Sequence, residues 1–85
     1  MLPPTLAVEI RPEGQSREWL RSKCGYYREN GTEAAWLVDP EQRRVEVFDA
    51  DCDGTILGKQ DTLTSAALPG FDLLLRDLFA VLDAA

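Results

Sequence analysis

The sequence feature that most constrains the fold is a run of five apolar residues near the middle of the chain. Residues 34–38 read AAWLV, and an aspartate and Pro40 follow directly. A strand with apolar side chains at every position is typical of the centre of a sheet that is covered on both faces. Pro40 ends the strand because proline cannot donate a hydrogen bond to a neighbouring strand. The chain must therefore supply further strands beside this one, and other elements that cover both faces of the sheet.

Alternation of apolar with polar or small residues predicts the other strands. Residues 5–11 alternate in this way, with Val8 and Ile10 on the apolar side, which is typical of a half-buried strand. Residues 43–48 alternate again, and the turn-forming sequence DPEQR that precedes them predicts a hairpin with the central run. We expect a short additional strand at residues 55–58.

Helical periodicity predicts two helices. Ser16 is a suitable N-cap for the first, and Gly31 is suited to the position just after its C-terminus. Its broad apolar face comprises Trp19, Leu20, Cys24, Tyr26 and Tyr27. The second helix follows a break at LPG, and its apolar positions are Leu75, Leu78, Phe79 and Leu82. The order β-α-β-β-(β)-α indicates one α/β (α+β) domain over residues 1–85, a mixed β-sheet with flanking helices.

The charge distribution bears on nucleic-acid binding. The net charge is −6, whereas a generic nucleic-acid-binding domain is basic. Residues 1–31 nevertheless carry a net charge of +1, and residues 32–85 carry −7. Any phosphate contact is therefore expected from the stripe of Arg17, Arg21 and Arg28 on the first helix. The alternative is a solvated face on which the arginines pair with local glutamates, Glu18 and Glu29.

Cysteine usage and hydropathy bear on the cellular location. Cys24 and Cys52 form no C-x-x-C motif, and the chain has no histidine to complete a zinc site. Two reduced thiols in a cytoplasmic protein are the expectation. The N-terminus lacks the pattern of a signal peptide, and no apolar run approaches the about 20 residues of a membrane span, so we expect no membrane association.

The sequence FDADCDGTILGKQD resembles the beginning of a calcium-binding loop. Asp49, Asp51, Asp53 and Gly54 stand at the first, third, fifth and sixth positions. The twelfth position is Gln60, which cannot supply the bidentate carboxylate, and the flanks favour strands where an EF-hand has helices. An acidic hairpin loop is the preferred interpretation. Calcium binding by the three aspartates is the alternative.

Lys23 interrupts the apolar face of the first helix between Trp19 and Tyr27. One interpretation is that its aliphatic stem crosses apolar surface and its amine reaches water. The other is that the amine is held against the sheet and directed at a carboxylate or a phosphate, with Glu9 as the natural partner. A carboxylate that binds Mg²⁺ and an amine that stabilises phosphate charge are the minimum for metal-assisted phosphodiester cleavage.

Four segments in order resemble the C-terminal half of the Uma-two family, restriction endonucleases of the PD-(D/E)xK nuclease superfamily. They are PTLAVEI, KCGYYRENG, EAAWLVDPEQRRVEVF and DTLTSAALPGFDLLLRDLF. Lys23, Tyr27 and Gly31 match the spacing of the family's helix. Trp36–Pro40 match its hairpin and Leu68–Phe71 its final loop. The resemblance implies a partial restriction-endonuclease-like core.

The resemblance also implies an activity and its residues. The family would be Mg²⁺-dependent hydrolases that cleave DNA, with Glu9 as metal ligand and Lys23 as the cation that orients water or stabilises the phosphate. Thr5 stands where the family has an aspartate, and Arg11 stands where the superfamily often has a lysine. A truncated nuclease that lacks part of its site is therefore one expectation. The alternative is a non-catalytic module that pairs an exposed sheet edge with a second copy or a partner chain.

Overall fold

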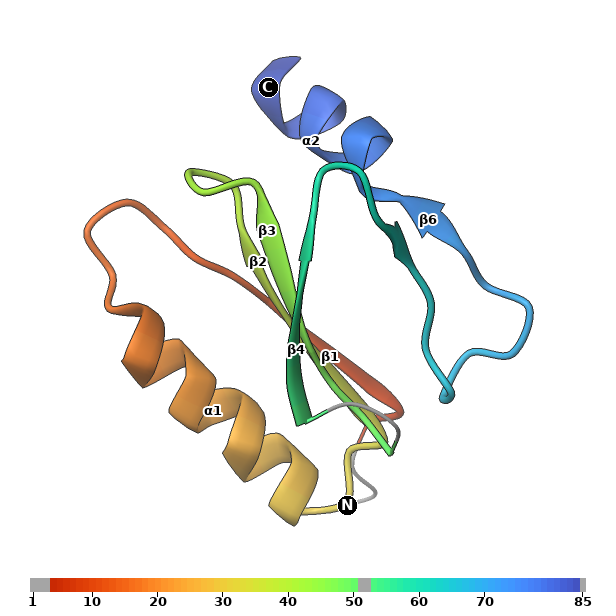
Figure 1. The fold of residues 1–85 in the computed structure, drawn as a ribbon. Helices are drawn as coiled ribbons and strands as arrows, with labels where there is room; N and C mark the ends of the chain where they lie inside the picture. The colour runs from red at the N-terminus through yellow and green to blue at the C-terminus, as the bar shows by residue number, and fades with distance from the viewer. Residues whose placement is uncertain (1–3, 51–52, 85) are drawn as a thin grey trace.

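The computed structural model describes residues 4–50 and 53–84 (Figure 1). In this part of the chain six strands and two helices follow one another in the order β1 (Leu6–Ile10), α1 (Arg17–Glu29), β2 (Ala34–Asp39), β3 (Arg44–Phe48), β4 (Asp53–Gly58), β5 (Thr62–Leu63), β6 (Leu73–Leu74) and α2 (Leu75–Ala84). The mixed sheet has the strand order β1-β2-β3-β4, and β5 and β6 form a separate antiparallel pair.

The apolar run forms the central strand, as the sequence predicts. All six residues of β2 are buried. β1 pairs with β2 in parallel because α1 carries the chain back across one face of the sheet, whereas the β2–β3 and β3–β4 pairs are antiparallel. The parallel arrangement brings the C-terminal ends of β1 and β2 to the same end of the sheet. There the guanidinium of Arg11 contacts Asp39 Oδ2 at 3.1 Å.

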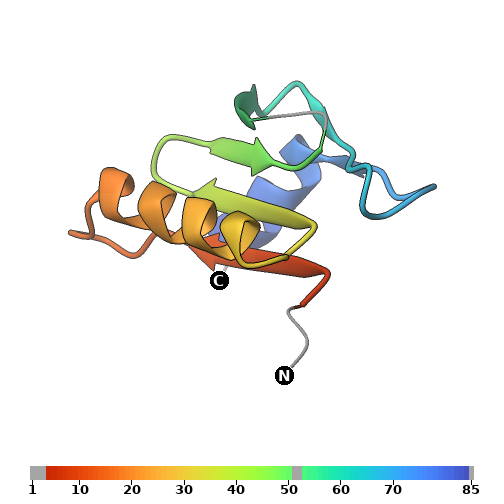
Figure 2. The same ribbon diagram turned by 90° about the horizontal axis from the view of Figure 1, so that it is seen from below.

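Two hydrophobic clusters cover the two faces of the sheet. On the α1 face, the buried members are Leu20, Cys24, Ala35, Leu37 and Phe48. On the other face, α2 and the β5–β6 pair enclose Trp36, Val38, Val45, Val47, Leu63, Leu75 and Phe79 (Figures 1 and 2). Residues of β2 alternate between the two clusters, which explains why the run has no polar position.

Caps fix α1 at both ends. The side chain of Ser16 accepts a hydrogen bond from the backbone N–H of Trp19 at 3.3 Å, so Ser16 is the N-cap as predicted. After the C-cap Asn30, Gly31 adopts a positive φ of 98°, the conformation that the position after a helix requires.

The apolar surfaces differ from the sequence prediction in two places. On α1 the buried stripe is narrower than predicted, because Trp19 and Tyr26 are largely exposed. On β1 the side chains of Val8 and Ile10 remain 47% and 54% exposed. On this face α2 and the β5–β6 pair pack mainly against β2 and β3, so the apolar side of the edge strand stays open. No described helix has the length and apolar character needed to cross a membrane.

Candidate active site at the edge of the sheet

Glu9 lies on the edge strand β1, one residue before its end. Because side chains alternate along a strand, Glu9 shares the α1 face with Ala7, which packs against the α1-side cluster. In the register of the sheet Glu9 stands opposite Leu37. The carboxylate is therefore placed beneath α1 but close to the open edge, where its side chain keeps 19% of its exposure.

Two side chains of α1 bind the same oxygen of this carboxylate. The Lys23 ammonium lies 2.9 Å from Glu9 Oε1, and the Tyr27 hydroxyl donates a hydrogen bond to Oε1 at 2.6 Å. Lys23 and Tyr27 are four residues apart and so lie on one side of the helix. The ammonium also lies 5.0 Å from the centre of the Trp19 ring, within the range of a cation–π contact. The predicted contact between Lys23 and Glu9 is therefore present.

These contacts shift the pKa values of the three groups apart. The hydrogen bond from Tyr27, and then that from Lys23, lowers the pKa of Glu9 below its ordinary value of 4.5. The same carboxylate raises the pKa of Lys23 above 10.5 and the pKa of Tyr27 above 10. The carboxylate and the ammonium thus stay charged together throughout the neutral range, and the tyrosine stays a hydrogen-bond donor.

Glu9 and Lys23 supply some, but not all, of the groups that a metal and phosphate site needs. The Lys23 side chain is 36% exposed, so its ammonium faces both the carboxylate and solvent. Glu9 Oε1 is occupied by two donors, and no described group bonds the second oxygen. A Mg²⁺ site needs one or two carboxylates together with substrate oxygens. The described residues contain no group of three candidate ligands, so they do not by themselves form such a site.

The three arginines predicted to contact nucleic acid have partners within the protein. Arg17 and Arg21 both bind Glu46 of β3, each with a nitrogen 2.9 Å from a carboxylate oxygen. Glu46 is nearly inaccessible, at 4% of its side-chain exposure. Arg28 donates to the backbone oxygens of Thr32 and Glu33 at 2.9 and 2.7 Å. The alternative prediction, that the arginines pair with Glu18 and Glu29, is wrong. Arg17 and Arg21 pair with a buried carboxylate of the sheet, and Arg28 binds backbone oxygens.

The acidic loop lies between two strands, as its flanks predict. Asp49 directly follows β3 and accepts a hydrogen bond from the Ser65 hydroxyl at 3.1 Å, and Asp53 opens β4. Gly54 has a φ of 89°, so glycine is required there for backbone geometry. Asp51 and Cys52 lie outside the described residues. Cys24 is buried without a disulfide partner, and burial raises the pKa of its thiol to about 11.

Sequence reasoning missed two members of the polar network. The helical period predicts Tyr27 on the apolar face of α1, although its hydroxyl makes the shorter of the two contacts with Glu9. Its position four residues after Lys23 places both side chains on the same side of the helix, and this spacing is the signal in the sequence that both can reach Glu9. Glu46 alternates with Val45 and Val47, a pattern that places it on the opposite side from the valines and says nothing of whether that side is covered.

Comparison with known proteins identifies similar sequences and folds. Residues 1–77 match the Uma2 family, whose description reads "Putative restriction endonuclease". A solved structure described as a "putative nuclease belonging to DUF820" from Anabaena variabilis ATCC 29413 matches with a TM-score of 0.81 and 21% sequence identity. The match covers 94% of this chain and 46% of that one, so the chain spans about half the length of the solved nuclease. No curated protein matches.

The Glu46 contacts predict a stability effect. Replacing both Arg17 and Arg21 by glutamine leaves a buried carboxylate without a cation, and we expect the free energy of unfolding to fall by about 3–5 kcal/mol. Either single substitution should cost less than half of this, because the other arginine remains. Urea unfolding followed by circular dichroism measures both.

Two variants serve as controls for this prediction. Arg44→Gln removes the same charge from a side chain without a partner in the described structure, and we expect a change within about 0.5 kcal/mol. Adding Glu46→Leu to the double variant should recover most of the loss, since the buried charge is then gone. A double variant as stable as the wild type would contradict the assignment.

Proposed function

The chain belongs to the Uma2 family, and on this premise we propose that it supplies part of the active site of a DNA endonuclease, with Glu9 and Lys23 as its catalytic contribution. The observation that carries the proposal is the contact of 2.9 Å between the Lys23 ammonium and Glu9 Oε1 at the open edge of a nuclease-like sheet. The other three cations on α1 bind the buried Glu46 or backbone oxygens within the protein.

Lys23 is placed to act on a phosphodiester. Its ammonium is fixed by Glu9 and by the ring of Trp19, and it keeps a solvent-facing side on which a phosphate oxygen can bind. Negative charge grows on the phosphoryl oxygens as water attacks phosphorus, and a pre-positioned cation stabilises that charge. The raised pKa of Lys23 keeps the amine protonated at neutral pH, which suits this electrostatic role and not that of a general base.

The proposal includes Mg²⁺ with Glu9 as one ligand. The free oxygen of Glu9 faces no described donor, so it is the atom that this chain can offer. When bound, Mg²⁺ would activate water and neutralise phosphate charge. The remaining carboxylate has to come from outside the described residues, since these hold no suitable cluster.

The open edge of β1 supports a second function, in which this strand joins two copies of the chain. Val8 and Ile10 leave a regular, five-residue strand with exposed apolar side chains and unpaired backbone groups on its outer side. The opposite edge is less suitable, because the β3–β4 pairing is interrupted by a bulge and β4 contains two glycines. Antiparallel pairing of two β1 strands around a two-fold axis forms one continuous sheet. It also places both copies of Glu9 on the same face.

Plasmid cleavage tests the enzymatic function. In the presence of Mg²⁺ we expect Glu9→Gln and Lys23→Ala to reduce the rate by at least about 100-fold, because each removes a charge that acts in the transition state. Glu33→Gln makes the same chemical change at an exposed residue whose side chain has no described partner, and it should cleave like the wild type. The proposal is overturned by variants as active as the wild type, or by a wild-type chain that stays inert at high protein concentration, where a second copy can supply the remaining carboxylate.

Light scattering after size-exclusion chromatography tests the pairing of β1. We expect the wild type to elute with twice the mass of one chain. Val8→Lys should shift it toward the monomer, because two charged side chains then lie near each other where the two β1 strands pair. Ile56→Lys is the matched control, since Ile56 is 48% exposed on the opposite edge strand. A monomeric wild type at high concentration speaks against the pairing, as does an equal effect of the two variants.

A further inference from the structure

Three basic side chains are the cations without a partner in the described structure. The chain has nine lysines and arginines, all of which are described. Six of them form ion pairs or hydrogen bonds within the protein: Arg11, Arg17, Arg21, Lys23, Arg28 and Arg43. Arg44, Lys59 and Arg76 form none among the described residues. An unpaired cation on a chain of net charge −6 is a group left available for an anion.

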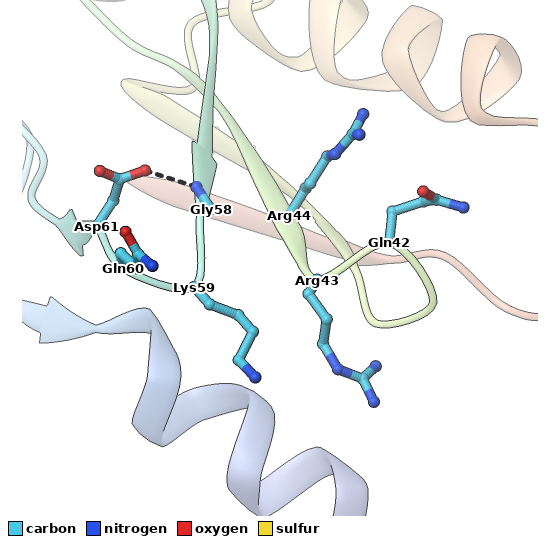
Figure 3. Close-up of a pocket in the computed structure, with 7 residues that line it drawn as sticks. All are labelled: Gln42, Arg43, Arg44, Gly58, Lys59, Gln60 and Asp61. Atoms are coloured by element: carbon cyan, nitrogen blue, oxygen red, sulfur yellow. Dashed lines mark hydrogen bonds between the residues drawn. The ribbon is translucent and has the colours of Figure 1, made fainter.

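These three residues, the basic end, lie together where β3 begins, β4 ends and α2 begins. Arg44 is the first residue of β3 and stands opposite Gly58, so Lys59 follows on the neighbouring strand. A hollow of about 400 Å³ has Arg44 and Lys59 in its wall, and an adjoining hollow of about 440 Å³ has Lys59 and Arg76. Figure 3 shows Lys59 projecting toward α2 and Arg44 toward α1, so the charges straddle the end of the sheet.

Most side chains in the walls end in groups that can donate hydrogen bonds to phosphate oxygens. The amides of Gln42 and Gln60 add neutral donors, and Leu74 is the one apolar side chain among the described wall residues. The acid in the walls is Asp61, which accepts the backbone N–H of Gly58 at 2.7 Å. Arg43 also lines the first hollow, and its guanidinium pairs with Asp83 of α2. Arginine, lysine and glutamine are typical partners of nucleic-acid phosphates.

We propose that the basic end binds the phosphate backbone of the duplex DNA that is engaged at Lys23. The proposal rests on the proposed endonuclease function, which supplies the ligand. Glu9 and Arg44 lie two residues apart along the strands and two strands apart across the sheet. At 3.3 Å per residue and 4.8 Å per strand, their Cα atoms are about 12 Å apart. One duplex can span this distance, because its phosphates repeat every 3.4 Å along the axis of each strand.

We assign phosphate binding to the basic end and not to the stripe of Arg17, Arg21 and Arg28, because those three side chains have partners within the protein. The charge distribution along the sequence predicts phosphate contacts in residues 1–31, because residues 32–85 are acidic as a whole. In the folded protein the four basic side chains of residues 32–85 all line the two hollows. Asp61 is the acid of this segment among the described wall residues, and Asp39, Glu46 and Asp49 are buried elsewhere.

Fluorescence anisotropy with a fluorescein-labelled 20-base-pair duplex tests the proposal. Binding is measured in EDTA, without cleavage, between 50 and 200 mM NaCl. Each phosphate contact adds about 0.9 to the slope of log affinity against log salt. We expect the triple variant Arg44→Gln, Lys59→Gln, Arg76→Gln to lose about 2.7 from the slope, and Lys59→Gln alone about 0.9. Three contacts correspond to a loss of about 40-fold in affinity over this salt range.

Arg28→Gln is the matched control, because it removes one charge from the surface predicted by sequence alone. We expect its slope to equal that of the wild type, with folding of each variant checked by thermal unfolding. The proposal is overturned by an unchanged slope in the triple variant, by an equal effect of Arg28→Gln, or by a wild type that does not bind the duplex at 50 mM NaCl. Tighter binding of a polyglutamate peptide than of the duplex would overturn it in favour of an acidic protein partner.

These experiments distinguish failure of the binding proposal from failure of the endonuclease proposal. A chain that binds the duplex through the basic end but does not cleave a plasmid supports this proposal and removes the endonuclease function. A chain that cleaves, with the triple variant unchanged in its salt dependence, removes this proposal and leaves the endonuclease function standing.

Discussion

Two carboxylates on one row of the sheet hold α1 in place, and the rest of the structure depends on them. Glu9 and Glu46 stand on either side of Leu37, all three facing the helix. Glu46 binds Arg17 and Arg21, and Glu9 binds Lys23 and Tyr27. Between these polar contacts the helix buries only a narrow apolar stripe. The polar contacts therefore set the rotation of α1 about its axis, and with it the position of the Lys23 ammonium.

The two carboxylates of this row differ in their access to solvent, so the buried one acts in stability and the partly exposed one is open to a ligand. Glu46 lies on an inner strand under two arginines and is almost fully covered. Glu9 lies on the edge strand, where both it and Lys23 keep part of their exposure. The same kind of contact thus stabilises the helix at one end and presents a charged pair at the other. Arg44 of the basic end lies on the same sheet, with its Cα atom about 12 Å from that of Glu9.

Local patterns in the sequence predict the elements and the contact between Lys23 and Glu9, but not the partners of the arginines on α1. The central strand, the hairpin, the caps of α1 and the apolar face of α2 follow from period and turn chemistry, and the structure agrees with them. The family resemblance and its nuclease-like fold are confirmed by the match over residues 1–77 and by the solved nuclease. What alternation cannot tell is which polar face is covered. Glu46 is buried because α1 covers it with two arginines, and Val8 is exposed because the cluster on the α2 side is built on β2 and β3.

The most direct test of this account is the titration of the Glu9 carboxyl group by ¹³C NMR. We expect a pKa below 4.5 in the wild type, because Tyr27 and Lys23 both bind the charged form. We also expect Tyr27→Phe to raise this pKa, since the tyrosine hydrogen bond is the largest cause of the shift. The carboxylate then loses its contribution to folding only as the pH falls through the lowered pKa. A wild-type Glu9 that titrates at or above 4.5, unchanged by Tyr27→Phe, would contradict the account.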